Sequence, residues 1–272
     1  MGATKKYFKR QFKTQMFKLE YDDASDFYLG CFQKNRSCVP LLLLRALLFF
    51  GSVAIVIASI VLTVEAGKGA HWPIYLTHWG LVMMMISTGF GFAISVVTYI
   101  KGPIDGTFGL PWYVKAYWVL YNIALPLALF ITIFYWVFLA GLADSEEAAE
   151  LELAVNEVLD IFIHAINSVV MVLLLLIARQ PVFILHFYQV FGFALVYMFF
   201  SLIYHFAGGV DQFGLPYIYP VLDWNQPGIA VLAVLFSAIL IIIIHFLVAL
   251  LVQARDAIGK CYRKDNGFSL AS

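Results

Sequence analysis

The sequence predicts an all-α, polytopic membrane protein: a bundle of six transmembrane helices with both termini in the cytosol. The first observation is composition, because 62% of the 272 residues are hydrophobic and only 12% are charged, with a mean hydropathy of +0.87. Soluble domains carry about 25% charged residues. The other two observations are a series of long apolar segments and the distribution of Lys and Arg between them. We therefore expect the lipid bilayer as the main partner and no nucleic-acid partner.

The chain divides into a basic tail (1–38), a transmembrane domain (39–255) and a C-terminal tail (256–272). The six apolar segments lie at about 41–64, 75–100, 113–142, 158–178, 183–206 and 228–252. Each has the roughly 20 residues that a helix needs to cross the hydrocarbon. Pro73 suits the first turn of the second helix, and Trp72 and Trp79 suit the membrane interface. Pro181 separates the fourth helix from the fifth, because proline cannot continue a preceding helix.

The orientation follows from the basic residues of the tails and loops. Placing both termini in the cytosol puts every one of the 17 Lys and Arg residues except Lys68 on the cytosolic side, as the positive-inside rule requires. Cys31, Cys38 and Cys261 then lie in cytosolic segments near the membrane, where disulfides are rare. S-palmitoylation and an ordinary reduced thiol remain open alternatives for each of them.

The fourth segment carries the candidate functional site. Asn156, Asp160, His164 and Asn167 follow one another at spacings of 4, 4 and 3 residues, which places them on one face of a helix. Polar and ionisable groups inside a membrane helix are costly, so such a face normally contacts protein or a water-filled cavity.

Thr77, near the outer end of the second segment, is the candidate partner of His164. Counting along the two helices places them roughly 10 Å apart in depth before any tilt. A Thr hydroxyl is a weak nucleophile and needs a base such as imidazole. Asp160 would orient the imidazole, and Asn167 would orient the ring or bind an oxyanion. The alternative is a hydrogen-bond network that only holds the helices together.

The remaining polar residues predict neither a metal nor a cofactor. His71, His78 and His205 fall on the outer side, but no two of them have the i,i+4 spacing of a helical metal site. The loop at 208–228 is rich in Gly, Pro and aromatic residues and must cap the bundle or project from it. A lid over the polar face and a cap without catalytic role are both open. Asp223 in this loop would supply a carboxylate if Asp160 does not.

Several motifs together resemble the rolling stone family of insects. They read YLTHWGL (75–81), HAINS (164–168), RQPVFILHFYQV (179–190), FSLIYHFAGG (200–209) and IYPVLDWNQPG (218–228). The resemblance implies a multi-pass protein of the plasma membrane, with the endoplasmic reticulum as second choice. It also implies a role in myoblast fusion, with an unidentified membrane partner.

A more distant resemblance concerns the androgen-induced and androgen-dependent transmembrane hydrolases, which cleave fatty acid esters of hydroxy fatty acids. It rests on a Tyr-Leu-Thr start to one helix and a His-containing helix two spans later. The resemblance implies that Thr77 and His164 are catalytic and that the substrate is a lipid ester.

Overall fold

The computed structural model describes residues 3–139 and 161–264, and over these residues the chain is helical without strands. The α-helices are α1 (Ala3–Gln11), α2 (Val39–Glu65), α3 (Leu76–Lys101), α4 (Trp112–Phe134), α6 (Asn167–Ile177), α7 (Phe187–Phe206) and α8 (Pro227–Lys264). Two π-helical turns, Tyr135–Leu139 and Phe162–Ile166, continue α4 and precede α6. Short 3₁₀ helices lie at Thr14–Phe17, Ala24–Phe27, Gly69–Ile74, Ile184–His186 and Pro220–Leu222.

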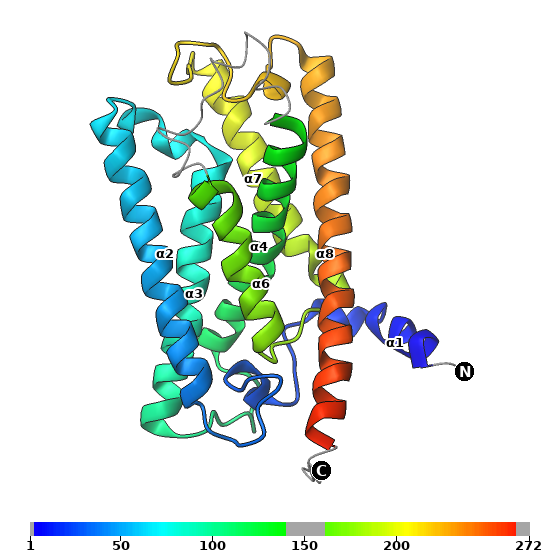
Figure 1. Ribbon diagram of the computed structural model, residues 1–272. Coiled ribbons are helices and arrows are strands. Elements are labelled where there is room, and N and C mark those ends of the chain that lie inside the picture. Colours follow the sequence, from blue (N-terminus) through cyan, green and yellow to red (C-terminus); the bar gives the residue numbers. More distant parts are fainter. Residues whose placement is uncertain (1–2, 140–160, 265–272) are drawn as a thin grey trace.

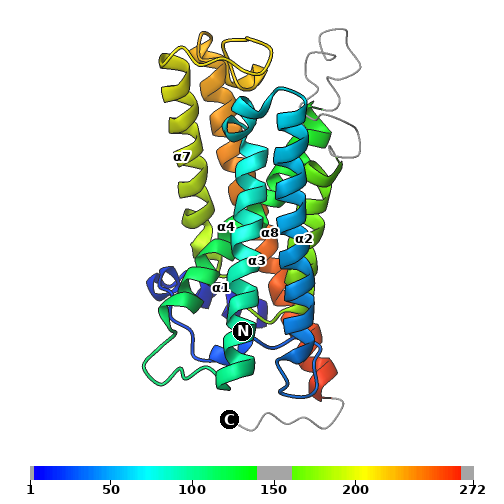
Figure 2. The ribbon, with the colours of Figure 1, turned by 90° about the vertical axis from the view of Figure 1, so that its left-hand side faces the viewer.

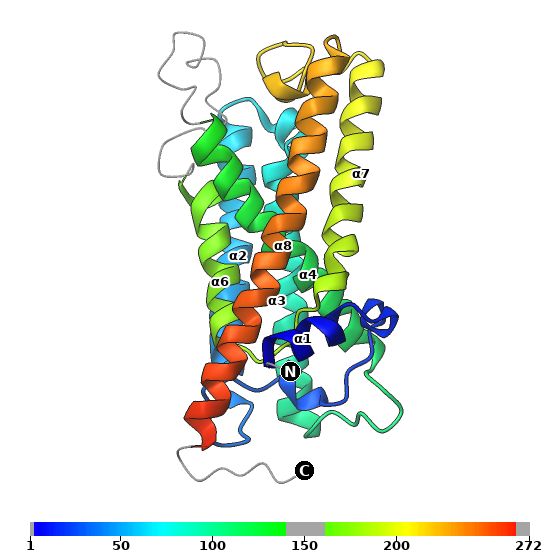
Figure 3. The same cartoon turned by 90° about the vertical axis from the view of Figure 1, so that its right-hand side faces the viewer.

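Helices α2, α3, α4, α6, α7 and α8 stand side by side and alternate in direction (Figures 1 and 2). The connection from α2 to α3 and residues 207–226 lie at one end of the bundle, which we call the loop end. Residues 12–38 and the last described turns of α8 lie at the opposite end, the tail end, where α1 packs beside α8 (Figure 3). Both termini of the described chain are therefore at the tail end.

Five of the described helices are long and apolar enough to cross a membrane: Val39–Glu65, Leu76–Lys101, Trp112–Val137, Ile184–Phe206 and Pro227–Arg263. Phe162–Ile177 forms a shorter apolar helix beside them. These helices indicate a multi-pass membrane protein. The sixth span, predicted at 158–178, begins outside the described residues, so it stays a prediction, as does the cytosolic side of the termini.

Helix α4 is the centre of the bundle. It contacts α3, α6, α7 and α8, and 61% of its apolar window is buried, against 22% for α7 and for α8. Trp118, Leu125 and Ile131 are among its buried side chains. The peripheral helices instead turn large apolar side chains outward, such as Phe199 and Ile239. Such outward apolar faces are expected where lipid tails replace water as the surroundings.

The two predicted tails are more structured than the sequence suggested. Helix α8 runs to Lys264 rather than ending near 252, and Arg255 within it donates to the carbonyl oxygens of Leu175 and Arg179 at 2.7 and 3.1 Å. In the N-terminal tail, Gly30 forms an isolated antiparallel bridge with Ala178. These contacts fix both tails because each satisfies backbone groups at the end of α6 that the helix leaves unpaired.

A buried arginine ties three helices together near the tail end. Arg45 of α2, only 1% exposed, donates to the Gly91 carbonyl and the Ser95 hydroxyl of α3 at 3.0 and 2.9 Å. It also donates to the Tyr117 hydroxyl of α4 and to Gln180 Oε1, both at 3.1 Å. None of these four partners is a carboxylate. The guanidinium is therefore solvated by neutral oxygens.

Candidate functional site

The structure brings Thr77 and His164 together at the loop end. Thr77 Oγ1 lies 3.4 Å from His164 Nε2. Both side chains are buried, with exposed fractions of 8% and 1%. A hydroxyl this close to an imidazole nitrogen can donate its proton to that nitrogen when the ring carries its own hydrogen on Nδ1.

The depth difference of roughly 10 Å that the sequence predicted is wrong. The count assumed that the second and fourth helices end at the same level on the tail side. In the structure α3 extends well beyond the end of α6 at the tail end (Figure 1), so equal counts from those ends do not reach equal depths. Thr77 is the second residue of α3 and therefore sits at its first turn.

His164 occupies a π-helical turn, and contacts to its ring and to its backbone carbonyl hold it in place. Phe162–Ile166 is π-helical, a local distortion that is frequent at functional sites. The Tyr135 ring stacks in parallel on the imidazole, with centroids 3.6 Å apart and planes 4° from each other. The Thr132 hydroxyl donates to the His164 carbonyl oxygen and lies 2.6 Å from the Ser168 hydroxyl. These contacts fix the imidazole plane in an orientation that presents Nε2 to Thr77.

Asn167 lies fully buried beside Gly80 of α3, where the missing side chain makes room chiefly for Ile131. A Cβ atom at Gly80 would stand 3.4 Å from Asn167 Nδ2. Neither the Nδ2 nor the Oδ1 of this amide has a hydrogen-bond partner within the described part of the chain. A buried amide without partners costs about 1–3 kcal/mol. Asn167, at the start of α6, therefore holds a donor and an acceptor without partners beside Gly80, one helical turn of α3 from Thr77.

The other polar residues that the sequence predicted for the site are Asp160, Asn156 and Asp223. Asp160 and Asn156 lie outside the described residues. Asp223 closes its own turn in the loop, where its Oδ1 accepts from the backbone N–H and the side-chain amide of Asn225 at 2.9 and 3.0 Å. The structure thus does not bring Asp223 to His164.

Two tyrosines that the sequence pattern did not single out as site residues, Tyr219 of the loop and Tyr197 of α7, hold the start of α3. The Tyr219 hydroxyl accepts from the Leu76 N–H at 3.0 Å, and the Tyr197 hydroxyl donates to the Ile74 carbonyl at 2.8 Å. Burial raises the pKa of the Tyr219 hydroxyl, and a hydrogen bond with Thr77 partly offsets this rise. The IYPVLDWNQPG motif was the available signal for Tyr219. No signal in the sequence predicted the contact between Tyr135 and His164.

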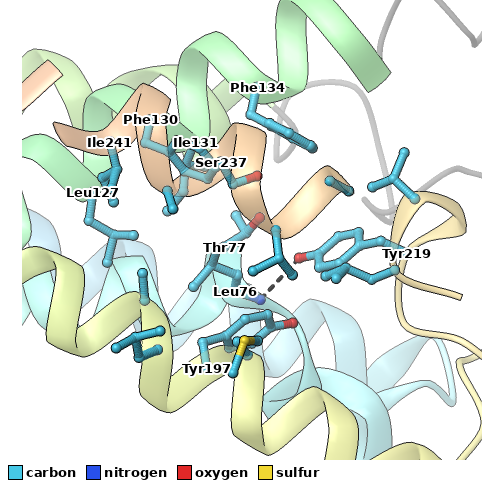
Figure 4. Close-up of a pocket in the computed structure, with 18 of the residues that line it drawn as sticks. Leu76, Thr77, Leu127, Phe130, Ile131, Phe134, Tyr197, Tyr219, Ser237 and Ile241 are labelled. Carbon is cyan, nitrogen blue, oxygen red and sulfur yellow. Dashed lines mark hydrogen bonds between the residues drawn. The ribbon is translucent and has the colours of Figure 1, made fainter. Parts of the chain in front are cut away.

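An apolar pocket that is partly open to the outside adjoins Thr77 of the pair. Figure 4 shows its walls, which come from α3, α4, α7, α8 and the loop. Thr77, Tyr135 and Tyr219 all line it, and almost all of the remaining lining is aliphatic or aromatic. The hydroxyl of Thr77 is therefore one of the few polar groups that this pocket presents.

The contacts of His78 and the exposure of Cys31 and Cys261 bear on the metal and acylation hypotheses. His78 stacks on Trp72 with centroids 4.5 Å apart, and its Nδ1 lies 2.5 Å from the Trp72 carbonyl oxygen. Within residues 3–139 and 161–264, no three His, Cys, Asp or Glu side chains gather as metal ligands would. Cys31 is buried, and burial raises the pKa of its thiol, whereas Cys261 is exposed. Of these two thiols, only Cys261 is therefore accessible to an acylating enzyme.

The fold and the site together define a multi-pass helical membrane protein with a buried Thr–His pair beside an apolar pocket. The family described as "Protein rolling stone" matches residues 2–262 of the chain. Protein rolling stone of Drosophila melanogaster is 33% identical over 237 residues, which cover 82% of this chain and 80% of the fly protein. No solved structure matches the chain. The chain belongs to the rolling stone family.

Proposed function

We propose that this protein acts at the plasma membrane in the fusion of myoblasts, with the loop end outside the cell. Membership of the rolling stone family over most of the chain is the observation that carries the proposal. The distribution of Lys and Arg supports the orientation. The partner on the opposing membrane would then meet the folded cap formed by residues 207–226.

The test removes the protein from cultured myoblasts and measures the fraction of nuclei in multinucleate cells. We expect fusion to fall and to recover when the wild-type chain is restored. An epitope inserted at Gly214, a turn residue with a φ of +84°, should be stained on intact cells. Normal fusion without the protein would refute the role, and staining only after permeabilisation would refute the orientation.

A second candidate function is hydrolysis of a lipid ester, and the 3.4 Å contact between Thr77 Oγ1 and His164 Nε2 specifically favours it. In this proposal His164 Nε2 takes the Thr77 proton as the oxygen attacks the ester carbonyl carbon. The imidazolium then gives that proton to the departing alcohol oxygen as its bond to carbon breaks. Water, deprotonated by His164, releases the fatty acid from Thr77 in a second round.

Asn167 and Tyr135 would assist that reaction in different ways. The unused Nδ2 donor of Asn167 would stabilise the negative oxygen of the tetrahedral intermediate. Tyr135 would hold the imidazole plane through the parallel stack. Asp160 keeps its predicted role of orienting the ring.

A fluorophosphonate probe tests the enzyme, because the activated hydroxyl displaces fluoride and keeps the phosphorus. We expect labelling of the wild type and of Thr77→Ser, and a loss of about 10⁴-fold or more in Thr77→Ala and His164→Ala. Thr98→Ala is the matched control, since Thr98 is buried on the same helix and bonds only its own backbone at Ile94. Equal labelling of wild type and Thr77→Ala would refute the hydrolase.

A further inference from the structure

We infer that the pocket between α4, α7 and α8 binds one acyl chain of a membrane lipid, which enters from the bilayer between α7 and α8. The inference goes beyond the proposed hydrolysis, because binding a chain requires no nucleophile. It rests on the depth of the pocket, the chemistry of its walls and the side on which it is open.

The depth of the pocket matches one leaflet of a bilayer. Its lining residues fall at 127–135 on α4, 191–198 on α7 and 233–241 on α8. Eight or nine residues of helix span about 11–12 Å at a rise of 1.5 Å per residue. The hydrocarbon of one leaflet is about 15 Å thick, half of a core of roughly 30 Å. The pocket lies in the half of the bundle nearer the loop end, so it faces the chains of that leaflet.

The walls of the pocket select hydrocarbon. Apolar cavities do not hold water stably, and a void forfeits the dispersion contacts of its lining. A pocket with such walls, set among membrane-spanning helices, is therefore filled by the lipid chains that surround it. The polar end of the chain would meet the Thr77 and Tyr219 hydroxyls, which both line the pocket.

The exposure of the lining indicates where the chain enters. The deeper lining residues of α4, Leu127 and Ile131, are buried, whereas Ala194 on α7 and Ala238 on α8 are partly exposed. At the loop end Tyr219, together with the 3₁₀ turn after it, covers the pocket, and Phe134 beside them is also partly exposed (Figure 4). We place the entry of the chain between α7 and α8, because there the exposed lining lies within two helices that are long and apolar enough to cross the membrane.

Photo-crosslinking of the full-length protein in lipid nanodiscs tests the inference. The probe is a phosphatidylcholine with a diazirine in the middle of one acyl chain. Lipids that merely surround the bundle can label exposed residues of α7 and α8 but cannot reach Leu127, Phe130 and Ile131 of α4, which are buried and line the pocket. We therefore expect mass spectrometry to find crosslinks on these three residues. Crosslinks confined to exposed side chains would overturn the inference.

A filled-pocket variant sharpens the test. Ala238→Trp should lower labelling of α4 about tenfold, since loss of two or so buried methylene groups already weakens binding by that factor. Its neighbour Ile239 is 59% exposed and outside the pocket, so Ile239→Trp is the matched control and should label normally. Ala194→Trp, which fills the pocket from α7, replaces Ala238→Trp if that variant does not fold.

Two further arms distinguish acyl-chain binding from ester hydrolysis and from sterol binding. Wild-type protein that gives the crosslinks on α4 but does not react with the fluorophosphonate would leave chain binding standing while the proposed hydrolase fails. Excess cholesterol should not compete with the probe. Complete displacement of the probe by cholesterol would show that the pocket prefers a rigid sterol and would overturn the acyl-chain assignment.

Discussion

Among single residues, Asn167 is expected to destabilise the fold while it assists the proposed hydrolysis. Its amide is fully buried and both of its polar atoms lack partners within the described residues. Such a group weakens the fold unless it is used by a ligand or an intermediate. At the tail end, Asp26 is a half-buried carboxyl that accepts a 2.7 Å hydrogen bond from the Tyr21 hydroxyl, and its partial burial has an energetic cost of its own.

Asn167→Leu should raise the free energy of unfolding, by up to about 1–3 kcal/mol, because it removes an unpaired amide without changing side-chain volume much. Ester hydrolysis should fall in the same variant. Thermal unfolding in detergent and turnover of a fatty-acyl ester measure the two effects. A variant that is less stable than the wild type would show that the amide has a structural partner.

Asp26→Asn should remove a pH dependence of stability. Burial raises the pKa of Asp26 above 3.8 in the folded protein. The protonated form is therefore favoured on folding, and its stabilisation is present below the unfolded pKa and lost as pH rises through the folded pKa. Wild type should lose stability relative to Asp26→Asn over that interval. Melting temperatures from pH 4 to 8 test this, with the exposed Asp22→Asn as control.

Among the elements, the packing of α2 against α3 and α4 depends on Arg45. Its four hydrogen bonds reach α3, α4 and the segment after α6, so the guanidinium fixes how these pieces meet. A buried charge is tolerated only while its donors remain paired. Removing an acceptor should therefore cost more than removing the charge itself.

Gln180→Leu should lower the free energy of unfolding by about 1.5–3 kcal/mol, since it removes one of the four acceptors of Arg45 and the acceptor of the Tyr117 hydroxyl. Arg45→Met should cost less, and the double variant should be less unstable than the sum of the single changes predicts. A double-mutant cycle by chemical denaturation measures this coupling. Strict additivity would contradict the account.

At the scale of the whole molecule, the N-terminal segment acts as a strap across the tail end. Gln11 Oε1 accepts from the Ile184 N–H at 3.0 Å, the Lys18 carbonyl oxygen lies 3.2 Å from His186 Nε2, and Tyr188 donates to the Phe17 carbonyl. The strap thereby satisfies backbone and side-chain groups where α7 and the 3₁₀ turn before it begin. Residues 11–18 and 184–188, which are far apart in the sequence, thus pack together at the tail end of the bundle.

Gln11→Ala should destabilise the protein by about 1–3 kcal/mol, because it leaves a buried N–H at Ile184 unpaired. Gln15→Ala is the matched control, since Gln15 is exposed on the same segment. Hydrogen exchange at Ile184 should speed up only in the first variant. Equal exchange in both variants would show that the strap does not protect the start of the fifth helix.

The sequence predicted the helical membrane class and the residue types of the site, because both depend on local pattern. Apolar length is enough to indicate a span, and a polar face within one span is visible from spacing alone. The depth match of Thr77 and His164 was not predictable, since it depends on how far α3 extends past α6. Tyr135 and Tyr219 were also hidden, because a π-helical turn and a long-range loop contact bring them to the site.

The hydrogen bond between the Tyr219 hydroxyl and the Leu76 N–H can form only late in biosynthesis. Leu76 begins the helix that carries Thr77, yet the group that caps it lies 143 residues later. At about 5–20 residues per second, the ribosome reaches Tyr219 roughly 7–30 s after Leu76. The first turn of α3, which carries Thr77, therefore enters the membrane without this cap, and the contact forms only once nearly all the helices have been made.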